Sequence, residues 1–146
     1  MKFFNVRTYG ILVNSNQEIL LSDELYNGQQ FTKFPGGGLE LGESLPDAIR
    51  REFIEECNLK LDNIELLYVT DKVIQSDFND SQVIGVYYQV FTKDKLKVAT
   101  KTATFDFEPG SEQSFRWIPL QNFSSNDLTY PMDQDAWSAI KDRIIL

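Results

Sequence analysis

Segments rich in β-branched and aromatic residues recur along the chain, and each of them predicts a strand. The first two such segments, residues 5–13 and 18–22, are separated by four polar residues and are predicted to form a hairpin. Residues 31–34 alternate between apolar and polar positions and end at Pro35. Further strands are predicted at residues 64–73, 83–91 and 114–118.

The polar stretches between these segments predict loops. Residues 23–30 are expected to form a polar loop. Residues 92–112 are long, polar and contain Pro109 and Gly110, so we expect a loop there, with room for a short strand at residues 103–107. A second helix is predicted from about Pro131, because apolar residues then recur at every fourth position: Met132, Ala136, Ile140 and Ile144. This helix is expected to pack against a sheet.

Three glycines, Gly36 to Gly38, form a glycine run after Pro35, and the residues that follow it predict the start of a helix. Ser44 can cap its first turn, Asp47 follows three residues later, and Pro46 is tolerated in a first turn. The helix is predicted to end near Cys57. Asn58 then suits the left-handed conformation that commonly closes a helix.

Glutamates occupy the apolar stripe of this predicted helix. At about 100° per residue, Glu52 and Glu56 fall on the face that begins with Leu45 and Ile49, and Glu55 lies beside them. The glutamates of a solvated helix would lie opposite its apolar face. Burying a carboxylate costs several kcal/mol unless it is paired or bound to a cation. A hard divalent ion, Mg²⁺ or Mn²⁺, is the simplest counter-charge for such a cluster.

Two other interpretations of the glutamates remain open at this point. Arg50 and Arg51 could neutralise them through structural ion pairs. The C-terminal half of the helix could instead leave the core and expose its carboxylates to water.

Composition narrows the class of protein. The chain has 146 residues, of which 42% are apolar, and we expect a single folded domain over residues 1–146. It contains no histidine, which excludes histidine triads and histidine metal ligands, and its one cysteine, Cys57, cannot form an internal disulfide. No apolar run is long enough for a membrane span, and Arg7 interrupts the N-terminal apolar residues before they could form a signal peptide. We therefore expect a cytoplasmic protein.

The net charge of −8 makes the chain a poor candidate for binding polymeric nucleic acid, because that requires a basic surface. An acidic protein can still bind a phosphate ligand, provided that metal ions or a local basic cluster offset the repulsion.

Residues 37–59 read GGLELGESLPDAIRREFIEECNL. This segment resembles the signature of the Nudix hydrolases, G-x5-E-x7-R-E-U-x-E-E-x-G-U, in which U is a bulky apolar residue. Asn58 replaces the second glycine, and both residues tolerate the left-handed conformation. The other fixed positions are in register: Gly37, Glu43, Arg51, Glu52, Phe53, Glu55, Glu56 and Leu59.

The resemblance implies a fold of the α/β class, an α/β/α sandwich with a mixed, curved sheet between helices. It also implies an enzyme, a pyrophosphohydrolase that cleaves a nucleoside diphosphate linked to another group by water attack on phosphorus. The cofactor would be Mg²⁺ or Mn²⁺, and the partner a small nucleotide. Metal ligands would be the side chains of Glu52, Glu55 and Glu56 and the carbonyl of Gly37.

Further roles follow from the same resemblance. Glu43 and Arg51 match a pair that braces loop against helix. The general base would be Glu52 or an acid from a later loop, for which Glu112 precedes Phe115-Arg116-Trp117 as in the family, and Glu108 is a weaker choice. Arg7 and Lys33 are predicted to bind substrate phosphates, and Arg116 is a third candidate. Four aromatic residues could stack on a base, although strand aromatics usually belong to the core: Phe31, Phe78, Tyr87 and Tyr88.

Two alternative functions on the same fold stay open. One is a nucleotide-binding sensor without catalysis, although such domains usually lack several of the acids present here. The other is an isoprenoid-diphosphate isomerase, which needs a reactive cysteine near the substrate, whereas Cys57 lies at the predicted helix end. The resemblance leaves the substrate open among oxidised nucleoside triphosphates, ADP-ribose, dinucleoside polyphosphates and nucleotide sugars. It also leaves open a homodimer, in which many family members occur.

Overall fold

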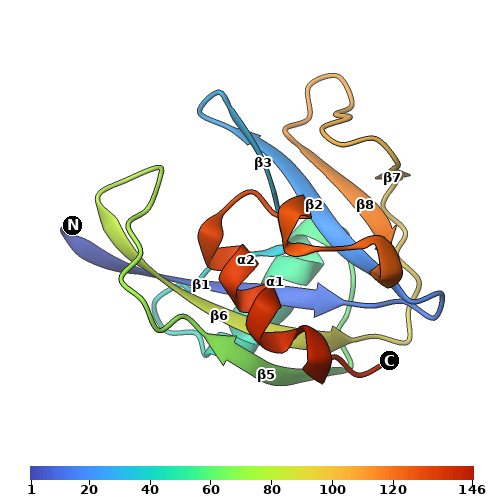
Figure 1. The fold of residues 1–146 in the computed structure, drawn as a ribbon, viewed down its shortest axis with the longest axis horizontal. Helices are drawn as coiled ribbons and strands as arrows, with labels where there is room; N and C mark the ends of the chain where they lie inside the picture. The colour runs from blue at the N-terminus through green and yellow to red at the C-terminus, as the bar shows by residue number, and fades with distance from the viewer.

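Eight strands form two four-stranded sheets in the computed structural model, which describes residues 1–146 (Figure 1). The first sheet has the order β4-β1-β6-β5, with β1 at Phe3–Leu12, β4 at Gly36–Gly38, β5 at Asn63–Val69 and β6 at Ser81–Phe91. The second has the order β3-β2-β8-β7, with β2 at Glu18–Tyr26, β3 at Gln29–Lys33, β7 at Thr100–Lys101 and β8 at Gln113–Pro119. Both sheets are mixed, because β1 is parallel to β6 and β7 is parallel to β8.

Two helices cover opposite faces of the first sheet: α1 at Leu45–Cys57 and α2 at Pro131–Ile140. Val83 and Tyr87 of β6 pack in the same core as α2, which lies in the foreground of Figure 1. Val86 and Val90 of the same strand pack in a second core with α1. This alternation of side chains is what period-two strands require when both faces of a sheet are covered.

The caps of α1 form as the sequence predicts. Ser44 accepts a hydrogen bond from the Asp47 amide at 3.1 Å, and Asn58 closes the helix with φ of 49°. Phe53 lies in the buried face and packs directly over Gly10 of β1, where any Cβ would overlap its ring. Glycine at position 10 therefore lets α1 approach the sheet, and the helix carries its glutamates to the edge of β4.

The loop predicted at residues 23–30 is wrong. Strand β2 continues to Tyr26, and a tight turn at Asn27 and Gly28, with φ of 49° and 75°, leads directly into β3. The charged residues Asp23 and Glu24 suggested a loop, but both carboxylates have cationic partners inside the protein. The Asn-Gly dipeptide is the sequence feature that favours this kind of hairpin.

Other element boundaries also differ from the prediction. The strand predicted over residues 64–73 ends at Val69, and no strand forms at residues 103–107, because β7 lies earlier and Phe105 has a φ of 58°. Helix α2 ends at Ile140, and a 3₁₀ turn at Lys141–Arg143 follows, so Ile144 packs against the core from outside the helix. None of the helices is long and apolar enough to cross a membrane.

Candidate active site

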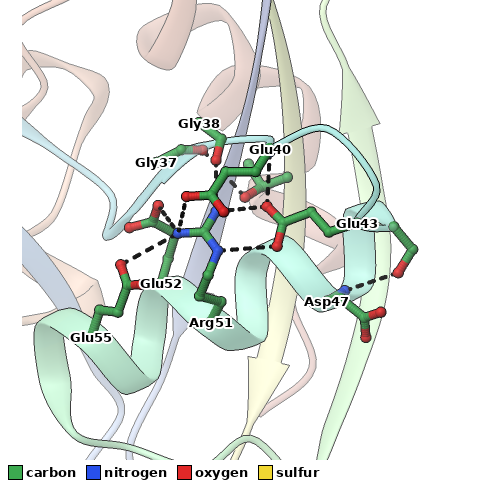
Figure 2. Close-up of polar contacts among 10 residues, drawn as sticks. Gly37, Gly38, Glu40, Glu43, Asp47, Arg51, Glu52 and Glu55 are labelled. Atoms are coloured by element: carbon green, nitrogen blue, oxygen red, sulfur yellow. Dashed lines mark hydrogen bonds and ion pairs between the residues drawn. The ribbon is translucent and has the colours of Figure 1, made fainter.

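Arg51 is the centre of a charged group on the outer side of α1, which we call the outer group: Glu40, Glu43, Arg51, Glu52 and Glu55 (Figure 2). Its guanidinium donates two hydrogen bonds to Glu43, at 3.0 Å from Nε and 2.6 Å from Nη2. Nη2 also donates to the Gly38 carbonyl at 2.8 Å. The hydrogen bonds from Arg51 lower the pKa of Glu43 below its usual value. Arg51 thus ties the loop after β4 to the helix, as the predicted bracing role requires.

Glu52 lies between Arg51 and the glycine run. Its side chain is 11% exposed, and its Oε1 accepts from Arg51 Nη1 at 2.9 Å. A Cβ at Gly37 would overlap the Glu52 carboxylate, so only glycine lets the two approach this closely. The Gly37 carbonyl accepts a long hydrogen bond from Thr8 Oγ1, at 3.4 Å.

Glu56 lies one turn further along α1 than Glu52, on the same partly buried face. Burial raises its pKa to about 7, against the opposing effect of Lys33. Its Oε2 is sealed from solvent and accepts no hydrogen bond. A buried carboxylate oxygen without a donor is costly, and it is the kind of atom that a cation would satisfy.

Lys33 and Glu24 stand next to Glu56, and we call these three residues the inner group. Lys33 Nζ lies 2.9 Å from Glu24 Oε2, and both Glu24 and Glu56 raise the pKa of Lys33 against the lowering effect of burial. The ammonium therefore stays charged inside the protein, where it offsets part of the charge of the two carboxylates.

Of the three glutamates expected to gather inward, two are partly buried. Glu52 and Glu56 follow the buried side of α1, whereas Glu55 is 57% exposed and bonds Arg51 at 3.3 Å. No three acidic, cysteine or histidine side chains converge closely enough to hold a metal ion. The ion pairs of Arg51, one of the alternatives left open by the sequence, account for Glu52 and Glu55 but leave Glu56 without a cation contact.

A pocket of about 360 Å³ opens beside the inner group, between the two sheets and the start of α2. One wall of the pocket is aromatic and consists of Tyr26, Phe31, Phe78 and Tyr130. The ring centroids of Phe78 and Tyr130 lie 5.5 and 5.4 Å from that of Phe31. Of the four aromatic residues considered for stacking, Phe31 and Phe78 therefore line the pocket, and Tyr87 and Tyr88 belong to the core. The roles of Tyr26 and Tyr130 were not visible in the sequence because neither lies near the glutamate motif.

Arg7 enters this pocket from β1. Its Nε donates to the Tyr9 hydroxyl at 3.0 Å, and its two terminal nitrogens make no hydrogen bond or ion pair. Arg7 also lies close to the glycine run, since a Cβ at Gly38 would be 3.7 Å from its Nη1. The structure thus brings Arg7 and Lys33 into one pocket, although no residue of α1 lines it.

Arg116 is not placed for a ligand. Its guanidinium is buried and forms a bidentate pair with Asp23, at 2.5 and 3.0 Å. Asp23 also accepts from Thr32 Oγ1 at 2.7 Å and from the Phe105 amide at 3.2 Å. This closed network holds the β7–β8 connection against β2.

Neither loop acid makes a hydrogen bond or an ion pair with the glutamate helix. The side chain of Glu112 is exposed and makes no hydrogen bond or ion pair, while its carbonyl accepts from the Leu25 amide at 2.9 Å. Glu108 pairs with Lys101. The next residue in the chain, Gln113, is the one that reaches the inner group, because its amide donates to Glu24 Oε2 at 3.4 Å.

Asp133 forms part of the pocket on the α2 side and was not predicted as a site residue. It is 1% exposed, and Oδ1 accepts a hydrogen bond from the Tyr87 hydroxyl. Burial raises the pKa of Asp133 to about 6.

Curated relatives of this chain include two RNA pyrophosphohydrolases. That of Ruthia magnifica is 36% identical over 73 residues, which is 50% of this chain and 40% of the relative's length. That of Pelagibacter ubique is 20% identical over 149 residues, or 92% of this chain and 87% of the relative.

Solved structures resemble the whole fold. The MutT NUDIX hydrolase of Burkholderia pseudomallei has a TM-score of 0.66 at 21% identity, over 94% of this chain and 98% of its own. A NUDIX hydrolase of Nitrosomonas europaea has a TM-score of 0.68 at 16% identity, over 95% and 89%. These likenesses confirm the predicted fold class. The family model of the NUDIX domain matches residues 4–142, and the chain therefore belongs to this family, the Nudix hydrolases.

Proposed function

We propose that this protein hydrolyses a pyrophosphate bond in a nucleoside diphosphate linked to another group, with Mg²⁺ as cofactor. One observation carries the proposal: Glu52 and Glu56 lie on the buried side of α1, beside a glycine cradle and a pocket that contains free guanidinium nitrogens. Two features fit a metal ion, the sealed Glu56 Oε2 without a donor and the close approach of Gly37 to Glu52.

The proposed metal ligands are the carbonyl of Gly37 and the carboxylates of Glu52, Glu55 and Glu56. A divalent ion held there would polarise the phosphate oxygens and lower the pKa of a bound water. Of the four, Glu55 would have to move most to bind a metal ion, because its side chain is exposed and paired with Arg51. This fit explains why an acidic chain of net charge −8 could accept an anionic substrate.

The chain's own residues would divide the remaining work. Arg7 has terminal N–H groups directed at no protein acceptor, and we propose that it binds the phosphate chain. Phe31, Phe78 and Tyr130 would take the nucleobase by stacking. Arg51 and Glu43 would hold the loop in place, while Glu52 is the first candidate for the base and Glu112 the second.

The names of the curated relatives favour a second substrate, the 5′-phosphorylated end of an RNA. The net charge of −8 disfavours extended contacts with an RNA backbone, although a single terminal nucleotide could enter the pocket. A sensor that binds nucleotides without hydrolysing them is the remaining alternative.

The test is a substrate panel with the purified protein and millimolar Mg²⁺. It should include oxidised nucleoside triphosphates, ADP-ribose, dinucleoside polyphosphates, nucleotide sugars and a 5′-triphosphorylated RNA, with products identified by mass spectrometry. We expect turnover of at least one of them, and removal of divalent ions by EDTA should abolish it.

The double substitution Glu55→Gln and Glu56→Gln should lower kcat about 10³-fold or more, because it removes two carboxylate ligands. Glu65→Gln, an exposed glutamate on β5, is the matched control and should retain full activity. Unchanged turnover in the double variant would refute these roles, and nucleotide binding without turnover under any divalent ion would support the sensor instead.

A further inference from the structure

Lys33 has no N–H group left for a ligand. Its Nζ lies 2.9 Å from Glu24 Oε2, 3.3 Å from the carbonyl of Phe34 and 3.2 Å from the carbonyl of Gly36. An ammonium group has three donors and no acceptor, so these contacts use all three. Lys33 is also 5% exposed, although it borders the pocket. Arg7, which borders the same pocket, differs because its terminal nitrogens contact no acceptor.

Glu24 is an equally committed partner. Its Oε2 accepts from Lys33, from the Ser22 hydroxyl at 2.8 Å and from the Gln113 amide at 3.4 Å. Gln113 in turn donates to Ser22 at 3.0 Å. The pair is therefore held by neighbouring strands β2, β3 and β8, and it does not depend on a flexible surface side chain.

The two carbonyls bound by Lys33 belong to the segment that carries the candidate metal ligand. Phe34 and Gly36 flank Pro35, and Gly37 follows immediately. Gly36 has a φ of 152°, and any Cβ there would overlap β1, so the segment is packed tightly against that strand. Lys33 fixes this segment from the pocket side, while Thr8 and Arg51 contact the carbonyls of Gly37 and Gly38.

We infer that Lys33 and Glu24 form a positioning pair that sets the Phe34–Gly37 segment and the surroundings of Glu56, and that Arg7 is the only pocket cation that contacts substrate. This inference rests on the proposed function for its kinetic part. It revises the role that the sequence alone predicted for Lys33, which was a phosphate contact. The distinction is physical, because a phosphate could reach Lys33 only by displacing Glu24 or a backbone carbonyl.

A positioning pair and a substrate contact respond differently to mutation. Removing one member of a buried ion pair leaves the other charge unpaired, which is strongly destabilising, and removing both charges avoids that penalty. A lysine that waits for substrate has no such partner, so its loss would leave the free protein as stable as before. The stability of the metal-free protein therefore separates the two roles without any activity measurement.

The experiment is a double-mutant cycle in EDTA with four proteins: wild type, Lys33→Met, Glu24→Gln and the combination of both. We expect Lys33→Met to lower Tm by about 10 °C, since breaking a buried pair typically costs a few kcal/mol. The combination should recover at least half of that loss. Lys72→Met, which removes an exposed lysine from its pair with Asp135 at 3.1 Å, is the control and should shift Tm by about 1 °C or less.

Kinetics on the best substrate of the panel supply the second arm. Lys33→Met should lower kcat about 10-fold with KM within about 3-fold of wild type, because it misplaces the segment that holds Gly37. Arg7→Ala should instead raise KM about 10-fold or more.

Three results would overturn the inference: an unchanged Tm for Lys33→Met, a combination whose Tm falls by the sum of the single effects, or a 10-fold rise of KM for Lys33→Met with kcat preserved. If Lys33→Met does not fold, a folded combination variant still supports the pairing and an unfolded one contradicts it. Should no substrate be turned over, the proposed function fails while the Tm cycle still decides whether Lys33 and Glu24 act as a pair.

Discussion

The outer and inner groups meet at one helix, which supplies Glu52 to the first and Glu56 to the second, and the two groups balance their charges differently. In the outer group a single arginine meets four glutamates near the surface, with five N–H donors arranged as a rigid fork. In the inner group a single lysine meets Glu24 directly and lies near Glu56 in the interior. Each group has too few cations for its acids, but only the inner group leaves a carboxylate oxygen sealed and without a donor.

This difference indicates which of the two groups contains the carboxylate that lacks a partner. Glu40 and Glu55 are more than half exposed to water, and the less exposed Glu43 and Glu52 each accept a hydrogen bond from Arg51, so the shortage of cations in the outer group costs little. A buried carboxylate has no such relief, and its raised pKa, about 7 for Glu56, expresses the same cost. The outer group is therefore braced without a ligand, and Glu56 is the member of the proposed ligand set that a divalent ion would relieve most.

The sharpest way to break this comparison is a substitution at Gly37, which lies between the two groups. Gly37→Ala should lower activity about 100-fold, because a Cβ would overlap the Glu52 carboxylate and displace it. Gly38→Ala is the matched control, since a Cβ there would meet nothing closer than Arg7 Nη1 at 3.7 Å. The measurement is kcat/KM for the two variants. Equal losses of kcat/KM would show that the site requires a glycine run without side chains in general, and that the close approach of Gly37 to Glu52 is not needed.

Arg51 tests the outer group alone. Arg51→Met should lower kcat about 10-fold, because it frees Glu43 and the Gly38 carbonyl from α1 but leaves the pocket intact. Arg51→Lys should recover little of this, since an ammonium cannot reproduce the two-bond fork to Glu43. A rise in KM without a fall in kcat would assign Arg51 to the substrate and contradict the bracing role.

The helix and its glutamates could be predicted because the determinants are local. Ser44 and Asn58 define the ends of α1, and the spacing of Glu52 and Glu56 follows from helical geometry alone. The exposure of the Glu55 side chain and its pairing with Arg51 could not be predicted from helical geometry. Both depend on Arg51, whose position is fixed by Glu43 and by the Gly38 carbonyl, and these come from a loop that the helix meets only in three dimensions.

The errors have the opposite origin, since they fall where distant residues decide the outcome. The charges of Asp23 and Glu24 suggested a loop, because the local sequence does not show which residues neutralise them. Their partners, Arg116 and Lys33, come from two other strands. Arg116 was a candidate phosphate ligand for the same reason, because its partner lies 93 positions away in the chain. A charged residue in a strand acquires its role only when its partner is known.

Asp133 extends the comparison to a buried acid that contacts no cation. Its pKa is raised to about 6 by burial, from an ordinary value near 4, so the folded protein binds this proton more tightly than the unfolded chain does. The stabilisation is fully present below about pH 4 and is lost as the pH rises through about 6. Asp133→Asn stays neutral throughout and keeps an acceptor for the Tyr87 hydroxyl.

The variant should therefore match wild type near pH 3.5 and exceed its Tm by a few degrees at pH 7.5, in thermal unfolding measured in EDTA. Asp135→Asn, on the same helix but with a half-exposed side chain, is the control and should show the same small difference at both pH values. If Asp133→Asn gained nothing at high pH, burial alone would not raise the cost of a carboxylate in this pocket. The orphaned oxygen of Glu56 would then lose its force as an indicator of a bound cation, because both arguments depend on the same desolvation.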